Sequence, residues 1–212
     1  MKAMIFAAGL GTRLKPLTDR MPKALVPVGG KPLLQIVVEK LAAAGFSEIV
    51  VNVHHFPEMI REFAEQHHHF GVTLHISDES EAILDTGGGL MKAADLLLGD
   101  MPVLIHNVDI LSDLDLQKLI AHHQASGALA TVVVRERHTQ RYLLFDEELR
   151  LAGWTNRAIG EVRTTRPEAV KNARALAFSG IQVIDPKIFS LITQCGKFSI
   201  IDTYLELAAH WP

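Results

Sequence analysis

The sequence predicts an α/β protein whose central sheet is mostly parallel and is covered by helices on both faces. Over the first 134 residues, short apolar runs alternate with segments whose apolar residues recur at helical spacing, which is the pattern of βαβ units. Residues 138–174 interrupt this alternation with a hairpin pattern and a polar stretch, so we expect a small β insertion there. The 212 residues, 48% of them hydrophobic, suffice for one large domain, predicted over 1–212.

The predicted strands are the apolar runs. Runs this short and this apolar are typical of strands buried on both faces of a parallel sheet. The first covers residues 3–8 and reads AMIFAA. The hairpin of the insertion is expected at residues 142–145 and 149–154. The other buried strands are expected at residues 48–53, 72–76, 103–106, 128–134 and 175–184.

The predicted helices have recognisable starts and ends. Pro32 suits a first helical turn and Gly45 suits a helix end, so we expect a helix over residues 32–44. Three glycines precede the helix that is predicted at residues 90–98. The remaining helices are expected at residues 57–66, 114–125, 186–192 and 201–209, with Asp113 and Asp115 interpreted as helix-entry residues.

Composition excludes several classes of protein. Lys and Arg total 21 against 24 for Asp and Glu, a net charge of -3 that argues against a nucleic-acid partner. No apolar run approaches the roughly 20 residues of a membrane helix, so we expect no membrane partner. A single cysteine, Cys195, excludes an intramolecular disulfide framework and favours the cytoplasm. The oligomeric state stays open, a homo-oligomer included.

Adjacent histidines suggest metal clusters at first sight. They occur as His54-His55, as residues 67–69 and as His122-His123. Neighbouring residues on a helix do not face each other, and zinc sites prefer a spacing of four. We therefore interpret these histidines as solvated helix ends.

The segment after the first predicted strand carries the first candidate site, because ligands of open parallel sheets bind beyond the carboxyl ends of strands. It contains Gly9 and Gly11, which allow a tight turn with N–H groups directed at an anion, and Arg13, whose planar charge suits phosphate. Leu14 and Lys15 complete neither the dinucleotide fingerprint nor the Walker pattern. We expect a phosphate loop of another kind; an ordinary tight turn is the alternative.

A proline-rich stretch continues this loop. Prolines reduce the conformational entropy that a loop loses on folding. A rigid loop that carries Arg13 and Lys23 suits the clamping of a polyphosphate, and a solvated basic loop is the alternative. The pattern Ala7-Ala8-Gly9-Leu10-Gly11-Thr12-Arg13-x-x-Pro16-x-Thr18, followed by Pro22-Lys23-x-x-x-Pro27-Val28 and Lys31-Pro32, resembles the sugar-phosphate nucleotidyltransferase family.

This resemblance, dense over 26 residues, implies a Rossmann-like three-layer α/β/α nucleotidyltransferase fold. It also implies a reaction between a nucleoside triphosphate and a sugar 1-phosphate, which gives a nucleotide-sugar and pyrophosphate. Arg13 would neutralise charge on the triphosphate, and Lys23 would hold the sugar phosphate or the α-phosphoryl oxygens. These two residues are the predicted catalytic residues.

The second candidate site is the glycine run at residues 85–89, where close backbone approach and a helix N-terminus favour a ligand; a plain helix entry is the alternative. By resemblance this run packs against the nucleoside. It is most similar to the branch that activates N-acetylmuramate 1-phosphate with UTP, although mannose- and heptose-phosphate guanylyltransferases carry similar runs. The predicted nucleotide-binding residues are Ala7, Ala8, Gly9, Gly11, Thr12, Arg13, Asp85, Thr86, Gly87 and Asn107.

The third candidate site is Asn107-Val108-Asp109, directly after a buried strand. Mg²⁺, the expected cofactor, is usually held by one or two carboxylates plus substrate phosphates. Asp109 corresponds to the metal aspartate of the family, whereas Val108 stands where the family usually has glycine. The family's C-terminal segment with a second metal aspartate is missing from these 212 residues, so we expect water and substrate to complete the site. Asp202 is interpreted as an N-cap or surface residue.

Two residues are predicted to contact the sugar. Phe178-Ser179-Gly180-Ile181 resembles the family's strand that lines the sugar pocket, through Gly180. Asn156 lies near the same place in the chain and suits sugar hydroxyls; a structural asparagine at a hairpin end is the alternative.

The function predicted from the resemblance is nucleotidyl transfer for cell-wall or surface-polysaccharide precursors. UTP with N-acetylmuramate 1-phosphate is the favoured pair, and GTP with mannose 1-phosphate is next. One alternative is a non-catalytic regulatory homologue that binds nucleotide-sugars, which Val108 and the missing aspartate support. The other is a glycosyltransferase of similar fold, although such enzymes tend to carry Asp-x-Asp where this chain has Asn107-Val108-Asp109.

Overall fold

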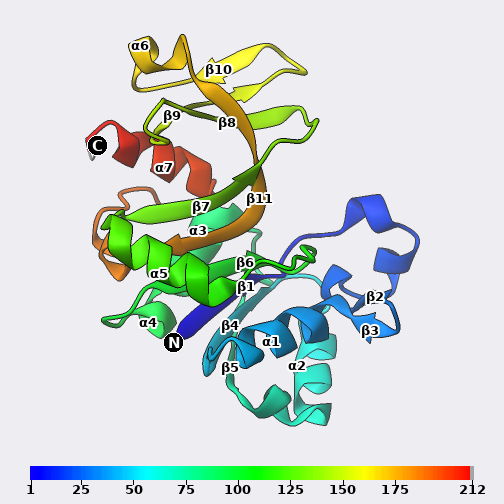
Figure 1. Cartoon of the computed structure of the whole chain (residues 1–212). Helices are drawn as coiled ribbons and strands as arrows, with labels where there is room; N and C mark the ends of the chain where they lie inside the picture. Colours follow the sequence, from blue (N-terminus) through cyan, green and yellow to red (C-terminus); the bar gives the residue numbers. More distant parts are fainter. Residues whose placement is uncertain (211–212) are drawn as a thin grey trace.

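The computed structural model describes residues 1–210, and in that range the chain forms a nine-stranded mixed sheet (Figure 1). Its parallel half has the strand order β6-β1-β4-β5. These strands are β1 (Lys2–Phe6), β4 (Glu48–Val53), β5 (Thr73–Asp78) and β6 (Val103–Asn107). Four of the predicted strands therefore form the parallel part of the sheet.

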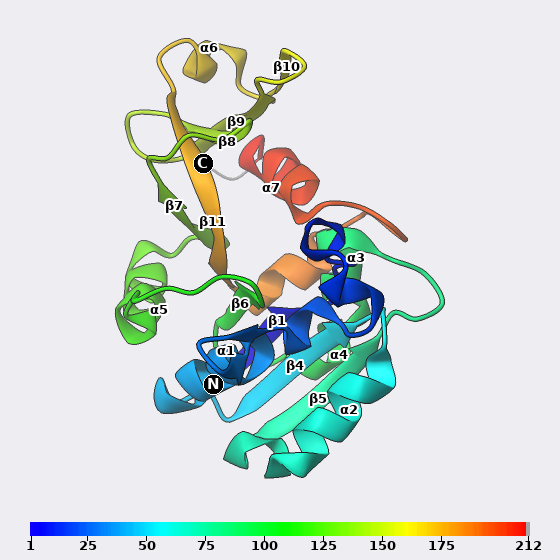
Figure 2. The same ribbon diagram turned by 90° about the vertical axis from the view of Figure 1, so that its right-hand side faces the viewer.

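The rest of the sheet is antiparallel. The long strand β11 pairs with β6, β7 and β8, so the strand predicted at residues 128–134 exists as β7 but runs antiparallel to its partner. Figures 1 and 2 show β8, β9, β10 and α6 as a lobe on one side of the parallel half. The elements are β7 (Ala130–Arg135), β8 (Arg141–Phe145), β9 (Leu151–Asn156), β10 (Glu161–Arg163), α6 (Pro167–Val170) and β11 (Arg174–Ile184).

Helices cover both faces of the sheet, which confirms the three-layer α/β/α prediction. Ile5 faces one core cluster and its neighbour Met4 the other, because successive side chains of a strand point to opposite faces. The first cluster contains residues of α1 (Leu33–Ala43), α2 (Pro57–Gln66) and α5 (Leu116–Ser126). The second contains residues of α3 (Asp85–Lys92), α4 (Ala94–Leu97) and α7 (Ile200–Ala208).

Most predicted boundaries lie within a few residues of the observed ones, and β4 and α2 match their predicted limits. Two predictions are wrong. The helix predicted at residues 90–98 begins at Asp85, so the glycine run lies inside α3, and the segment at 186–192 is a 3₁₀ helix, Pro186–Ser190. The sequence also did not predict β10 and α6. None of the helices in residues 1–210 is both long and apolar enough to span a membrane.

Candidate active site

The carboxyl ends of three neighbouring parallel strands meet at one edge of the sheet. Phe6, the last residue of β1, pairs with Asn52 of β4 and with Asn107 of β6. The segments that follow β1 and β6 consequently leave the sheet side by side (Figure 1). This register brings two of the three candidate sites of the sequence, the loop after β1 and the residues around Asp109, to the same place.

The loop after β1 presents a run of free backbone donors. Asn52 Oδ1 accepts the N–H groups of Ala7 and Ala8, at 2.7 and 3.3 Å. The next five N–H groups, those of residues 9–13, find no acceptor within residues 1–210. Consecutive free N–H groups in a turn form an anion-binding concavity. The loop therefore offers amide donors to an anion, whereas the N–H groups of Ala7 and Ala8 are already bonded to Asn52. Nucleotide contacts of these residues stay a prediction.

Gly11 lets the loop fold back on itself. Its φ is +62°, and Thr18 Oγ1 donates a hydrogen bond to its carbonyl oxygen at 3.0 Å. A Cβ at position 11 would lie 2.7 Å from Thr18 Cγ2 and 3.1 Å from Lys23 Cβ. The segment beyond it is a chain of 3₁₀ turns that ends in a two-stranded hairpin, β2 (Pro27–Val28) and β3 (Lys31–Pro32). Glycine is thus required here, and the compact loop carries both predicted catalytic cations.

Lys23 and Asp109 form an ion pair across this edge. Their side chains are 17% and 33% exposed, so the pair is partly shielded from solvent but still reachable by a ligand. Arg13 is exposed and has no carboxylate partner within residues 1–210. The predicted catalytic lysine and the predicted metal aspartate are therefore in contact, while the predicted catalytic arginine is free to meet an anion.

The residues at this edge fit a Mg²⁺ ion that depends on its substrate. Within residues 1–210, no group of three or more His, Cys, Asp or Glu side chains is placed to hold a metal. Asp109 offers one carboxylate, and its Oδ2 faces Lys23. Mg²⁺ is commonly held by one or two carboxylates together with substrate phosphates and water. The donor set matches that description and would be a poor site for a metal without a phosphate ligand.

The two predicted sugar residues lie in different places. Gly180 has φ +75°, and a Cβ there would lie 2.8 Å from Asn107 Nδ2 and 3.0 Å from Ile110, so Gly180 lines the same edge. Asn156 ends β9 in the antiparallel lobe, and its Oδ1 accepts the N–H of Ala158 at 3.2 Å. This contact is the one expected of a structural asparagine in a hairpin turn. The Nδ2 group of Asn156 makes no hydrogen bond within residues 1–210.

The start of α3 is occupied by the protein itself. The carbonyl oxygen of Phe198 accepts the N–H groups of Gly87 and Gly88, and the side chain of Asp85 accepts that of Thr86. A Cβ on Gly87 would lie 2.3 Å from the Phe198 ring, and one on Gly88 would lie 2.0 Å from the carbonyl oxygen of Gly196. The idea that these glycines leave a helix N-terminus open for an anion is therefore wrong. Contacts of Asp85, Thr86 and Gly87 with a nucleoside stay a prediction.

Sequence reasoning missed two polar residues of this edge, Asn52 and Glu79. Both are buried, at 3% and 1% exposure, and Asn52 Nδ2 donates to Glu79 Oε1 at 2.7 Å. A signal was present, because Asn52 is the one polar residue inside the apolar run from Ile49 to Val53, near the carboxyl end of a strand where ligand sites are expected. Glu79 directly follows the next strand of the sheet.

Some of the adjacent histidines are not the solvated helix ends that the sequence predicts. His54 directly follows β4, is half-buried, and its Nδ1 lies 2.6 Å from the carbonyl oxygen of Glu79. His123 is buried, and its Nδ1 lies 2.9 Å from Thr131 Oγ1, so it is not a solvated helix end. His106, directly before Asn107, is 1% exposed with its Nδ1 at 2.8 Å from the carbonyl oxygen of Asn107. Burial lowers the pKa of both His106 and His123. Asp115 caps α5 as predicted, whereas Ser199, and not Asp202, caps α7.

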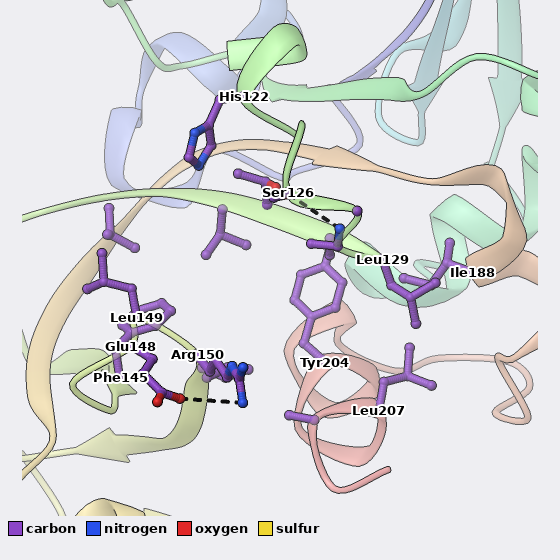
Figure 3. Close-up of a pocket in the computed structure, with 18 of the residues that line it drawn as sticks. His122, Ser126, Leu129, Phe145, Glu148, Leu149, Arg150, Ile188, Tyr204 and Leu207 are labelled. Atoms are coloured by element: carbon purple, nitrogen blue, oxygen red, sulfur yellow. Dashed lines mark hydrogen bonds and ion pairs between the residues drawn. The ribbon is translucent and has the colours of Figure 1, made fainter. Parts of the chain in front are cut away.

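A cavity of about 640 Å³ lies elsewhere, between the end of α5, the β8–β9 turn and α7 (Figure 3). Its lining is mainly apolar, and the Tyr204 ring projects into it. Burial raises the pKa of Tyr204, whose hydroxyl has no hydrogen-bond partner within residues 1–210. None of the predicted site residues lines this cavity, so it is separate from the sheet edge described above.

Comparison with known sequences points to one family. A family model described as "Nucleotidyl transferase" matches residues 2–143. A mannose-1-phosphate guanyltransferase of Neurospora crassa is 43% identical over 136 residues, which are 63% of this chain but 37% of that relative. An N-acetylmuramate alpha-1-phosphate uridylyltransferase of Neisseria meningitidis is 34% identical over 189 residues, 89% of this chain and 77% of the relative. The chain thus aligns with little more than a third of the length of the mannose-1-phosphate guanyltransferase.

Comparison with solved structures supports the fold. HddC from Yersinia pseudotuberculosis has a TM-score of 0.74 at 22% identity, over 94% of this chain and 82% of that one. A putative glucose-1-phosphate thymidylyltransferase from Bacillus anthracis has a TM-score of 0.78 at 21% identity, over 98% and 83%. At this level of identity the likeness establishes the Rossmann-like architecture alone.

Proposed function

The chain belongs to the nucleotidyl transferase family, and from this premise we propose that it joins a nucleoside triphosphate to a sugar 1-phosphate and releases pyrophosphate. The single observation that carries the proposal is the contact between Lys23 and Asp109 beside the run of free N–H groups after β1. A cation, a carboxylate and a row of amide donors at one sheet edge suit two phosphate-bearing substrates.

The reaction requires the protein mainly to orient the two substrates and to stabilise negative charge. An ionised oxygen of the sugar 1-phosphate attacks the α-phosphorus of the triphosphate in line. The new P–O bond forms as the bond to the β-phosphate oxygen breaks, and pyrophosphate leaves with that electron pair. Because the nucleophile is already ionised, no general base is required, and catalysis comes from orientation and charge stabilisation.

The residues divide this work. Arg13, exposed and without a carboxylate partner, neutralises the triphosphate as pyrophosphate departs. Lys23 holds the sugar phosphate or the α-phosphoryl oxygens, and exchanges Asp109 for these oxygens when they arrive. Asp109, with Asn107 beside it, would hold Mg²⁺, which supplies Lewis-acid neutralisation of the phosphates when bound. Gly180 keeps the sugar side of the edge open, since any side chain there would meet Asn107.

For the substrate pair, UTP with N-acetylmuramate 1-phosphate comes first and GTP with mannose 1-phosphate second. The extent of similarity favours this order. The uridylyltransferase relative aligns with 89% of this chain, including the antiparallel lobe, whereas the guanyltransferase relative aligns with 63%. The product would be a precursor of cell-wall or surface polysaccharides, and the site as proposed takes neither nucleic acid nor membrane.

A substrate panel tests the proposal. The four nucleoside triphosphates are each combined with N-acetylmuramate, mannose and glucose 1-phosphates in the presence of Mg²⁺, and pyrophosphate release is measured. We expect release to be fastest with UTP and N-acetylmuramate 1-phosphate. Nucleotide-sugar binding without turnover of any pair would replace the proposal with a regulatory role. Consumption of a nucleotide-sugar without pyrophosphate would replace it with glycosyl transfer.

A further inference from the structure

We propose that Asn52 and Glu79 are positioning residues for nucleotidyl transfer: together they hold the loop after β1 and the start of α3 in the geometry that the triphosphate meets. The inference rests on the proposed function and adds two residues to it. Neither side chain reaches the exposed edge, since both are almost fully buried. Their role is exerted through the backbone of the residues that do.

Asn52 holds the loop from beneath. Its Oδ1 accepts from Ala7 and Ala8, the two residues directly before the free N–H groups at 9–13. The orientation of the amide is unambiguous, because backbone N–H groups only donate and a carboxylate only accepts. The oxygen must therefore face the loop and the Nδ2 must face Glu79.

Glu79 connects this asparagine to α3. Its Oε1 accepts from Asn52 at 2.7 Å and its Oε2 from the N–H of Leu84, the N-cap residue of α3, at 3.3 Å. The positive end of a helix stabilises a carboxylate in this place. A Cβ at Gly89 would lie 2.6 Å from Oε1, so the helix packs directly on the carboxylate.

The burial of Glu79 is costly and calls for a reason. It is the only acidic side chain classed as buried within residues 1–210, and no cation pairs with it in that range. A buried carboxylate without a cation is unfavourable unless several hydrogen bonds satisfy it. Here those bonds fix Asn52 and Leu84 at the same time. Two segments with predicted nucleotide contacts, residues 7–13 and 85–87, are thus tied by a single buried pair.

Exchanging the donor and acceptor of the pair tests this idea. Asn52→Asp alone sets two carboxylates against each other at the 2.7 Å contact. Glu79→Gln alone leaves one donor facing another, either at Asn52 or at Leu84. The double variant Asn52→Asp/Glu79→Gln restores every bond and reverses only the direction of the one between the two side chains. The new carboxylate accepts from Ala7, Ala8 and the glutamine amide, whose oxygen accepts from Leu84.

We expect Asn52→Asp to raise the KM for the triphosphate and to lower kcat, with a total loss in kcat/KM of about 100-fold, the scale of a roughly 1 Å misplacement. The KM for the sugar 1-phosphate should change far less. The double variant should regain most of this loss, since residues in direct contact are not additive. Amide exchange at Ala7 and Ala8 should be fast in Asn52→Asp and slow again in the double variant.

Val50→Ala is the matched control, because Val50 lies two residues before Asn52 in β4 and belongs to the same core cluster as Leu90 of α3. It should lower Tm without raising the KM for the triphosphate. Wild-type kinetics in Asn52→Asp, or a double variant no better than that single variant, would overturn the proposal. Absence of pyrophosphate release in the wild type would refute the proposed function instead; calorimetric binding of UTP and GTP and the amide exchange would then still test the pair.

Discussion

The parallel and antiparallel halves of the sheet are stabilised in different ways. The parallel strands β1, β4 and β6 are buried on both faces by two large clusters, whereas the lobe has a small cluster in which only Leu143, Phe145 and Leu176 are buried. The lobe also carries partly exposed interactions, such as the Arg166–Asp146 ion pair at 3.0 Å and the Arg163 guanidinium 4.1 Å from the Trp154 ring centroid. Surface pairs of this kind add little stability.

This difference separates two tasks. Phosphates are common to every substrate pair of the proposed reaction, and the residues that suit them lie on the parallel half. The sugar varies, and Asn156 lies on the lobe, where few buried contacts resist substitution or local opening. We therefore expect changes in the parallel half to affect the rate with every substrate, and changes in the lobe to affect the choice of sugar.

The largest effect is expected for the two cations of the parallel half. Lys23→Ala and Arg13→Ala should each lower kcat by about 100- to 1,000-fold, because each removes a positioned charge from the transferring phosphates. The Tm should stay nearly unchanged, since Arg13 is exposed and Asp109 is the one charged partner of Lys23 within residues 1–210. Pyrophosphate release measures the effect. Lys31→Ala is the control, as Lys31 lies in the same segment but pairs with Glu39 at 2.7 Å. Near-normal turnover in both test variants would remove the catalytic assignment.

A smaller effect is expected where the two halves meet. Gly180→Ala should lower stability by about 1–3 kcal/mol, because alanine at φ +75° is strained and its Cβ would approach Asn107 within 2.8 Å. It should also lower kcat, because the new Cβ displaces Asn107, which lies two residues before Asp109. Gly160→Ala has a comparable φ of +67° but no atom within 4 Å of the new Cβ. It should reproduce the strain without the loss of rate, and equal kinetics in the two variants would separate Gly180 from the site.

The sequence predicts the parallel half of the sheet better than the antiparallel part. Hydrophobic periodicity and the residues that begin or end elements predict β4 and α2 at their observed limits, because these limits depend on local sequence. The partner of β7 depends on a strand some fifty residues later, and no local pattern identifies it. The sequence predicts that the glycine run precedes its helix, and glycine inside a helix costs roughly 1 kcal/mol relative to alanine. The fold nevertheless places these glycines inside α3, because Phe198 packs against Gly87 and Gly196 against Gly88, where no side chain would fit.

The candidate site shows the same limit. Lys23 and Asp109 were each predicted from their own motif, but their contact spans 86 residues and only the fold reveals it. Asn52 interrupts an apolar run, but that signal does not identify its partner, and Glu79, which follows β5, belongs to no motif. His123 was expected in solvent, and its hydrogen bond to Thr131 depends on how α5 packs on β7. Chemistry carried by a loop motif is readable, whereas the polar residues that support it are not.

A modest effect is expected in the lobe. Asn156→Ala should raise the KM for the sugar 1-phosphate by about 2- to 12-fold, the scale of one neutral hydrogen bond. The KM for the triphosphate should not change, and steady-state kinetics with each substrate varied in turn separates the two. Asn172→Ala serves as the control, because Asn172 is exposed in the same lobe beyond α6. An unchanged sugar KM would leave Asn156 with its turn contact to Ala158 alone.

The smallest effect is a pH dependence of stability in the parallel half. Burial lowers the pKa of His106, with Lys40 acting in the same direction, whereas the pKa of an unfolded histidine is about 6.5. The unfolded chain therefore binds the proton first, and stability present above that pH is lost as the pH falls, by at most about 1.4 kcal/mol per pH unit for one group. In His106→Leu the difference in Tm between pH 7 and pH 5 should shrink. His123→Leu should reduce it as well, since burial lowers that pKa too. An unchanged Tm profile in His106→Leu would show that His106 binds its proton equally well in the folded and unfolded chains, and would contradict the lowered pKa.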